Sequence, residues 1–356
     1  MSGIHELIFF IIFIVFIGIV LALDLGVFNK KSHVVSLKEA VIWTSIWVFL
    51  SVLFYLFLLF FGNILHDPKS IEELQAIITK YRQPIDISGL SFKDAINFYN
   101  SQISLEYITG YLIEYALSID NVFVMILIFL AFGIDKKYYH KILFWGILGA
   151  VIMRFIFIFI SSALIQRFDW ILYVFGVLLI FTGIKMFLDR NKHDKINTEK
   201  HPAVRFASKF FAIDPLYKGG KFRIKKGNKH FFTPLFLVLL VIEFTDVLFA
   251  VDSVPAIFSI TEDPYIVFFS NIFAIIGLRS LFFVISSVLD KFHLLKVGLS
   301  FLLVFVGLKM LFHIYLTERG FTTVHSLIVI AIIIFGSIIL SVIFPKKVIH
   351  NKGTTS

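Results

Sequence analysis

Five acidic residues lie inside otherwise apolar stretches of the chain: Glu114, Asp120, Glu243, Asp246 and Asp252. An ionised carboxylate in hydrocarbon costs at least a few kcal/mol even on the most lenient scales. Two arginines, Arg154 and Arg279, also lie mid-stretch and can pair with two of these acids, which leaves three negative charges. Those charges need protons or a bound cation, and a divalent metal would offset two of them. We favour cation binding over a purely structural network, and we interpret both arginines mainly as structural counter-ions.

The side chains available to a metal in these stretches offer oxygen. Cysteine is absent, and none of the eleven histidines falls in the middle of an apolar stretch. Oxygen ligands suit Mn²⁺, Mg²⁺ or Ca²⁺, whereas Cu⁺ and Zn²⁺ prefer sulfur or imidazole. The predicted metal ligands are Glu114, Asp120, Asn121, Asp246, Asp252 and Ser253. The predicted supporting residues are Asp24, Arg154, Glu243, Asn271 and Arg279.

The spacing of the acids limits how they can meet. Glu114 and Asp120 are six residues apart, as are Asp246 and Asp252, so an ideal helix would place each pair about 120° apart. Convergence on one ion then requires that the helix is interrupted or wraps around the ion. Pro255, three residues after Asp252, could free the carbonyl of Val251 for a cation or could simply kink the helix, and the sequence leaves both open.

Composition identifies the elements that must position these residues. The chain is 58% hydrophobic, has a mean hydropathy of +0.91 and contains 45 phenylalanines. A soluble fold of 356 residues could not bury that much apolar surface, so we predict an all-α, polytopic transmembrane helix bundle. About 20 apolar residues span a bilayer as a helix. By that criterion nine spans are predicted, at 7–27, 40–61, 107–132, 142–165, 170–188, 234–258, 265–289, 294–314 and 322–344.

Lysine and arginine alternate between successive connections. They are frequent around 30–38, 136–141, 190–229 and 346–347 and sparse in the others, which predicts an outer N-terminus and a cytoplasmic C-terminus. The net charge of +9 is therefore assigned to topology, and nucleic acid is excluded as a partner. The basic central loop is interpreted as a topogenic, lipid-facing segment, with a protein partner as the alternative.

The chain contains an internal repeat of three spans. Glu114 and Asp120 match Asp246 and Asp252 in spacing, and each pair precedes a small polar residue. Arg154 and Arg279 each stand six residues before an Ile-Ser-Ser motif, and the third spans end in Gly183-Ile-Lys-Met and Gly307-Leu-Lys-Met. Three spans per unit invert the second copy in the membrane, an architecture common in secondary transporters.

These features divide the chain into six parts. They are two N-terminal transmembrane helices (1–62), an extracytoplasmic segment (63–105), the first three-helix repeat (106–190), a basic cytoplasmic loop (191–233), the second three-helix repeat (234–315) and a C-terminal transmembrane helix with a short tail (316–356). The predicted site would lie where the two inverted repeats meet.

Two long runs resemble the signatures of the TerC family of membrane proteins. They are TGYLIEYALSIDNVF from Thr109 and TPLFLVLLVIEFTDVLFAVDSVPAIF from Thr233, and SNIFAIIGLRSL from Ser270 and ALDLGVF from Ala22 also fit. The resemblance covers almost the whole chain. It implies a relative of the LysE-type transporters, some of which are implicated in manganese export, in a family named after tellurium-resistance gene clusters. The family's metal-site acids would correspond to Glu114, Asp120, Asp246 and Asp252, although Tyr115 stands where many members have lysine.

We therefore expect a secondary transporter in the cell (inner) membrane that exports a hard divalent cation, Mn²⁺ first among them, as its substrate. No permanently bound cofactor, enzymatic activity or nucleic-acid partner is expected. Two alternatives stay open. One is a membrane scaffold or stress-response assembly factor acting through the basic loop, and the other is an exporter of a small cationic metabolite.

Overall fold

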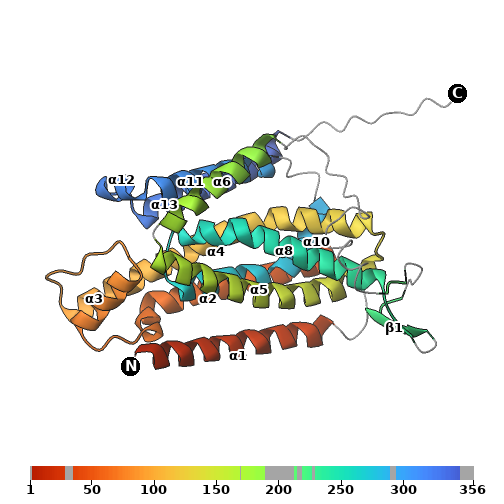
Figure 1. The fold of residues 1–356 in the computed structure, drawn as a ribbon, viewed down its shortest axis with the longest axis horizontal. Helices are drawn as coiled ribbons and strands as arrows, with labels where there is room; N and C mark the ends of the chain where they lie inside the picture. The colour runs from red at the N-terminus through yellow and green to blue at the C-terminus, as the bar shows by residue number, and fades with distance from the viewer. Residues whose placement is uncertain are drawn as a thin grey trace.

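A computed structural model describes residues 2–28, 35–168, 170–188, 212–214, 219–226, 229–288 and 294–344, and it is a bundle of long helices (Figure 1). The elements are α1 (Ser2–Phe28), α2 (Leu37–Phe61), η1 (Gly62–Leu65), α3 (Ile71–Lys80), α4 (Phe92–Ala131), η2 (Lys136–Tyr138), α5 (Tyr139–Arg167), α6 (Trp170–Leu188), β1 (Arg223–Lys226), β2 (Lys229–Phe232), α8 (Pro234–Phe258), α9 (Pro264–Ile276), α10 (Leu278–Val288), α11 (Leu295–Leu311), α12 (His313–Glu318) and α13 (Thr323–Ile343).

The structure confirms a polytopic helical bundle. Seven helices in the described residues are long and apolar enough to cross a bilayer, and α9 with α10, bent by 45°, would make an eighth span. All nine predicted segments overlap helices. Helix α11 has 17 residues and is shorter than any of the seven helices counted above, so the count of nine stays a prediction. Helix α4 begins at Phe92, which lies inside the predicted extracytoplasmic segment 63–105. The helix continues without a break for 40 residues, so the predicted boundary at residue 105 falls within it.

Local sequence signals explain where several helices begin. Ser91 caps α4 by accepting a hydrogen bond from the Asp94 amide, and Asp263 caps α9 by accepting one from the Tyr265 amide. Pro264 follows Asp263 at the first helical position, where a missing amide hydrogen costs nothing. These caps fix the N-terminal ends of α4 and α9, the helices that carry Glu114 and Asn271.

Helix α4 is the central element of the bundle. It packs against α2, α8, α9, α10 and α13, and three quarters of its apolar span is buried. The spans of α1, α2, α6 and α13 are only about one fifth buried, and their exposed side chains are mostly large and apolar, as expected of surfaces that face lipid. The polar residues of α4 are therefore shielded from lipid by surrounding helices.

Helices α6 and α11 cross at unusually short range in the part of the bundle that also contains α13 (Figure 1). A Cβ atom on Gly307 would lie 2.6 Å from the backbone oxygen of Gly176, and one on Gly183 would lie 2.8 Å from that of Ser300. The helices run antiparallel, because the residue earlier in α6 contacts the residue later in α11. The small residues are needed for this approach of two backbones.

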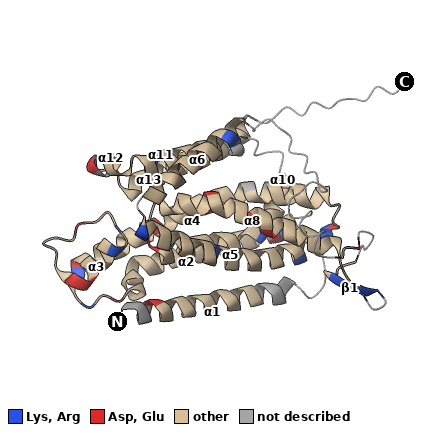
Figure 2. Cartoon of the chain, viewed as in Figure 1, with Lys and Arg blue, Asp and Glu red and all other residues tan. Residues whose placement is uncertain are grey.

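Opposite ends of the bundle carry different loops. Helix α3 lies at one end, and the antiparallel β1–β2 hairpin, whose ribbon is marked largely as Lys and Arg, lies at the other (Figure 2). In the hairpin, Lys226 forms an ion pair with Asp214. Most of the predicted basic loop, 191–233, falls outside the described residues. The arrangement agrees with the loop charges, but the orientation in the membrane stays a prediction.

Candidate cation site in the bundle core

Arg154 of α5 lies at the centre of a polar cluster between α4, α8 and α9. Its side chain is about 1% exposed. Nη1 donates to a carboxylate oxygen of Glu114, to Oδ1 of Asn271 at 3.0 Å and to Oγ of Ser253 at 3.2 Å, while Nη2 reaches Oδ1 of Asp246 at 3.4 Å. One buried cation thus joins acids from both predicted repeats.

The cluster also fixes the orientation of Glu114. Asn271 Nδ2 donates to its second oxygen at 2.9 Å, and the Ser118 hydroxyl lies 3.4 Å from its first. Hydrogen-bond donors therefore reach both carboxylate oxygens of Glu114. Glu114 is a buried carboxylate held in one orientation rather than a solvated side chain.

Two polar atoms of the cluster, Oδ2 of Asp246 and Nε of Arg154, have no hydrogen-bond partner among the described residues. The same holds for Nδ2 of Asn121 on α4. Two carboxylates, Glu114 and Asp246, share one guanidinium, so this group of three residues has a net charge of −1. Buried polar groups are usually paired, and unpaired ones at a charged centre are characteristic of functional sites.

The structure does not bring all the predicted ligands together. Asp252 accepts a hydrogen bond from Thr182 of α6 at 3.1 Å, away from the Arg154 cluster. Glu243 lies against Gly149 of α5, where a Cβ atom would come within 2.1 Å of its carboxylate. Asp120 and Asp24 lie on α4 and α1, but their side chains fall outside the described part of the structure.

Helix α8 is continuous through Pro255 to Phe258. The unwound segment that would have brought Asp246 and Asp252 onto one ion is absent from α8, so the predicted break at Pro255 does not occur. Six residues of regular helix then direct the two acids to different neighbours, as the helical geometry requires.

The second arginine, Arg279 of α10, is also buried but lies elsewhere. Its Nη1 is 3.3 Å from Nε2 of His140 at the start of α5. Together with Asp246 and Gly146 it lines a cavity of about 10 Å³, close to the room that one water molecule needs. Arg279 thus borders the site from the side of this cavity.

Among the described residues, no three His, Asp or Glu side chains are arranged to hold a metal ion. The guanidinium of Arg154 fills the space between the two carboxylates in this conformation. The central place of Arg154 was only partly predicted, because the sequence indicates a counter-ion but not which acids it joins. The roles of Ser118, Thr182 and His140 were missed, since no spacing signal links them to the acids.

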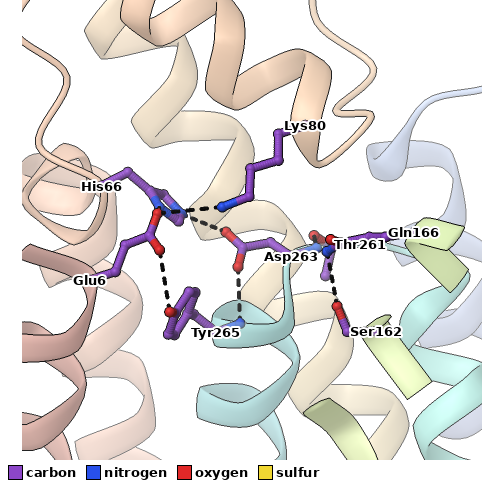
Figure 3. A network of polar contacts seen from close by, with 8 residues as sticks. All are labelled: Glu6, His66, Lys80, Ser162, Gln166, Thr261, Asp263 and Tyr265. Carbon is purple, nitrogen blue, oxygen red and sulfur yellow. Dashed lines mark hydrogen bonds and ion pairs between the residues drawn. The ribbon is translucent and has the colours of Figure 1, made fainter. Parts of the chain in front are cut away.

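A second polar network lies at the end of the bundle that carries α3 (Figure 3). His66 is fully buried, with Nδ1 2.8 Å from Glu6 and Nε2 2.8 Å from Asp263. Two carboxylate acceptors on one imidazole require both ring nitrogens to carry protons. Burial alone would lower the pKa of His66, but Asp263 and Glu6 outweigh it and raise that pKa to about 9.

Further contacts extend this network. Lys80 of α3 lies 3.8 Å from Glu6, and the Tyr265 hydroxyl donates to Glu6 at 3.3 Å. Gln166 and Ser162 of α5 are joined by a hydrogen bond of 3.1 Å close by (Figure 3). The network connects α1, α3 and α9, and no local sequence pattern indicates it, because its residues are far apart along the chain.

Comparison with known proteins agrees with this architecture. The model of the TerC integral membrane protein family matches residues 99–348. An uncharacterized membrane protein of Myxococcus xanthus is 44% identical over 84% of this chain and 81% of its own length, and one of Rickettsia felis is 37% identical over 96% and 99%. A protein of Escherichia coli strain K12 named putative membrane-bound redox modulator Alx is 38% identical over 84% of each chain. No solved structure matches. The chain therefore belongs to the TerC family of integral membrane proteins.

Proposed function

We propose that this protein is a secondary transporter of the inner membrane that exports a hard divalent cation, with Mn²⁺ as the first candidate. The observation that carries the proposal is the buried guanidinium of Arg154 between Glu114 and Asp246. These two carboxylates come from equivalent positions of the two predicted repeats. The guanidinium cation of Arg154 already lies between them, and every side-chain atom that accepts a hydrogen bond from it is an oxygen.

Charge balance favours a divalent substrate. With Arg154 in place, the pair of carboxylates keeps a net charge of −1. If a divalent ion replaced the guanidinium, the two carboxylates would be neutralised, and Asn271 and Ser253 would be released as neutral oxygen ligands. Arg154 then serves as the internal cation of the ion-free state, which keeps the acids from lying uncompensated in the membrane.

Helix packing supports the inverted-repeat arrangement that transport would use. Gly183 corresponds to Gly307, and Gly176 corresponds to Ser300, seven residues earlier in each copy. The two close contacts between α6 and α11, Gly183 with Ser300 and Gly307 with Gly176, therefore interchange when the copies are exchanged. In the repeat, α4 corresponds to α8 and α5 corresponds to α9. The packing of α4 on α9 therefore becomes the packing of α8 on α5 when the copies are exchanged, and the structure contains both contacts.

The other candidate functions have less support from the residues. The relatives named putative redox modulators carry that name for themselves, and this sequence has no cysteine for thiol chemistry. A transporter that sets the supply of a metal could affect redox state without such chemistry. A cationic metabolite would need more room than the cavity beside Asp246 gives in this conformation.

The test is Mn²⁺ flux into liposomes that contain the purified protein. Glu114→Gln and Asp246→Asn keep the shape of each side chain and remove its charge, so both should lower flux by about tenfold or more. Asp135→Asn is the matched control, because that carboxylate is exposed and pairs only with Lys137 in the structure. Flux in both site variants equal to that of the wild type would overturn the proposed site. No flux of Mn²⁺, Mg²⁺ or Ca²⁺ by the wild type would favour the scaffold function.

A further inference from the structure

A further buried carboxylate, Glu106 of α4, lies apart from the cluster described above. Its side chain is fully buried, and it stands eight residues before Glu114, about 12 Å away along the helix axis. Between the two, Gly110 lies so close to its neighbours that a Cβ atom would come within 2.9 Å of side-chain atoms of Ile257 and Ser270. A tightly packed layer therefore separates Glu106 from the proposed cation site.

Only one of the two carboxylate oxygens of Glu106 has a protein partner. Oε1 accepts a hydrogen bond of 2.9 Å from Gln102, whose side-chain amide also donates to Thr323 of α13 at 3.1 Å. Oε2 has no hydrogen-bond partner among the described residues. Glu106 lines a cavity of about 60 Å³, which has room for a few water molecules. A neutral acid would donate to such a water and a carboxylate would accept from it, so the cavity can satisfy both protonation states.

A positive charge faces the same cavity from another helix. Lys309 of α11 lines the cavity, and its Nζ donates to the backbone oxygen of Ser259 at 2.8 Å. Within the part of the chain that the structure describes, no direct ion pair joins Lys309 to Glu106. Ionised Glu106 is attracted to this ammonium group across the cavity, and neutral Glu106 is not. The other charged or titratable groups near Glu106 are Tyr81, Arg82, Tyr99, Glu262, Asp263 and His313.

The cavity connects both helices of the proposed cation site to the helices around them. Glu106 lies on α4, the helix of Glu114. Lys309 holds the carbonyl of Ser259, which caps the C-terminal end of α8, the helix of Asp246. A change of charge at Glu106 therefore alters the attraction between α4 and α11, and α11 is attached to the end of α8.

Glu106 does not belong to the repeated acid pairs. The alignment that matches Glu114 with Asp246 places Val238 opposite Glu106. A residue that is present in one copy alone does not contribute to a site built from equivalent positions of both copies. Glu106 is therefore a distinct acid, with its own cavity and its own counter-charge.

We propose that Glu106 is the proton-binding site of this transporter, and that proton uptake there is exchanged for the exported cation. A proton passes from a hydronium ion in the cavity to Oε2, which gives the neutral acid and water, and the reverse step restores the carboxylate. The inference rests on the proposed function and names the ion that drives it. Coupling is reciprocal, so cation binding between Glu114 and Asp246 must lower the proton affinity of Glu106 by the factor by which the proton lowers the cation affinity.

The first experiment measures both fluxes in liposomes that contain the purified protein, with one dye for Mn²⁺ and one for pH. In the wild type, protons should move in the direction opposite to Mn²⁺. Glu106→Gln keeps the acceptor for Gln102 but cannot ionise, so the ratio of proton flux to Mn²⁺ flux should fall about tenfold or more while Mn²⁺ still moves down its gradient. Glu106→Asp retains a titratable acid and should retain proton counterflow. Glu72→Gln, a substitution of an exposed acid of α3, is the matched control.

The second experiment detects the proton without transport. In infrared spectra of the protein in metal-free nanodiscs, a carboxylic acid band should grow as the pH falls, and this band should be missing from Glu106→Gln. Lys309→Met removes the positive charge across the cavity, so the band should appear at a higher pH than in the wild type. A purely structural Glu106 would give neither a titrating band nor this shift.

Each outcome of these experiments is decisive. The inference is overturned if the wild type moves Mn²⁺ without protons, if Glu106→Gln keeps the wild-type flux ratio, or if no titrating band is lost in that variant. If Glu106→Gln stops both fluxes, the infrared titration and the flux ratio of Glu106→Asp decide in the same way. A wild type that carries no Mn²⁺ but shows the Glu106 band would refute the proposed transport and leave the proton-binding site in place.

Discussion

The buried His66 should make the α3 end of the bundle pH-dependent. Its imidazolium donates to Glu6 of α1 and to Asp263, the residue that caps α9, so it holds two helices together. Titratable and charged groups around it also include Tyr81, Lys80 and Tyr265. The two carboxylates raise the pKa of His66 from 6.5 to about 9. The protonated imidazole is therefore favoured as long as His66 contacts both Glu6 and Asp263.

The sign and size follow from linkage. A folded-state pKa above the unfolded value means that the stabilisation is fully present below pH 6.5 and is lost as pH rises through 9. The rise in the His66 pKa from 6.5 to about 9 corresponds to about 3 kcal/mol. That energy is a few-hundredfold change in the equilibrium constant for separating His66 from its two carboxylates. That value is an upper limit for local opening, because the separated end of α1 need not be fully unfolded.

Amide hydrogen exchange measures this opening directly. After correction for the intrinsic rate, exchange at the start of α9 and near Glu6 should rise steeply between pH 6.5 and 9 in the wild type. His66→Gln should show faster exchange at pH 6.5 and little further change with pH. His5→Gln is the matched control, since the His5 side chain is exposed and its Nδ1 lies 3.4 Å from Asp67. A wild-type profile that stays flat over this range, or the same pH dependence in His66→Gln, would refute the reasoning.

Three other predictions concern packing, capping and the acids of α8. Gly307→Ala should destabilise the contact between α6 and α11 by about 1–3 kcal/mol, because its Cβ would meet the backbone of Gly176. Gly336→Ala, which has no atom within 4 Å of the new Cβ, should not lower the melting temperature. Ser91→Ala should cost about 1 kcal/mol through the lost cap of α4, measured as a lower melting temperature in detergent. Asp252→Asn should lower Mn²⁺ flux less than Asp246→Asn does, because Asp252 faces Thr182 and not Arg154; equal losses would place Asp252 in the same site.

The sequence was sufficient for the bundle and for the composition of its centre. Apolar runs of about 20 residues are a strong signal, because only helices satisfy their own backbone groups in lipid. Glu114, Asp246, Asn271 and Arg154 could be singled out because polar residues are rare in such runs. Their three-dimensional grouping could be anticipated only as far as the internal repeat relates one copy to the other.

What could not be predicted depends on contacts between distant segments. His66 and Asp263 are 197 positions apart, and neither stands in a recognisable motif, so their ion pair has no local signature. The separation of Asp252 from Asp246 depended on whether α8 breaks at Pro255, which the residue type alone does not decide. The 40-residue length of α4 was underestimated, because its N-terminal part, before the predicted span at 107–132, is polar and does not meet a hydropathy criterion.

The internal repeat relates residues to one another but does not determine their contacts. The residues at equivalent positions of the two copies differ in type, since Asn271 corresponds to Gly146 and Ser253 corresponds to Asn121. Equivalent arginines therefore have different hydrogen-bond acceptors within reach. Arg154 joins Glu114 of the first copy to Asp246 of the second, so its position depends on how the two copies pack against each other. That packing is a property of the whole bundle, and no spacing within one copy specifies it.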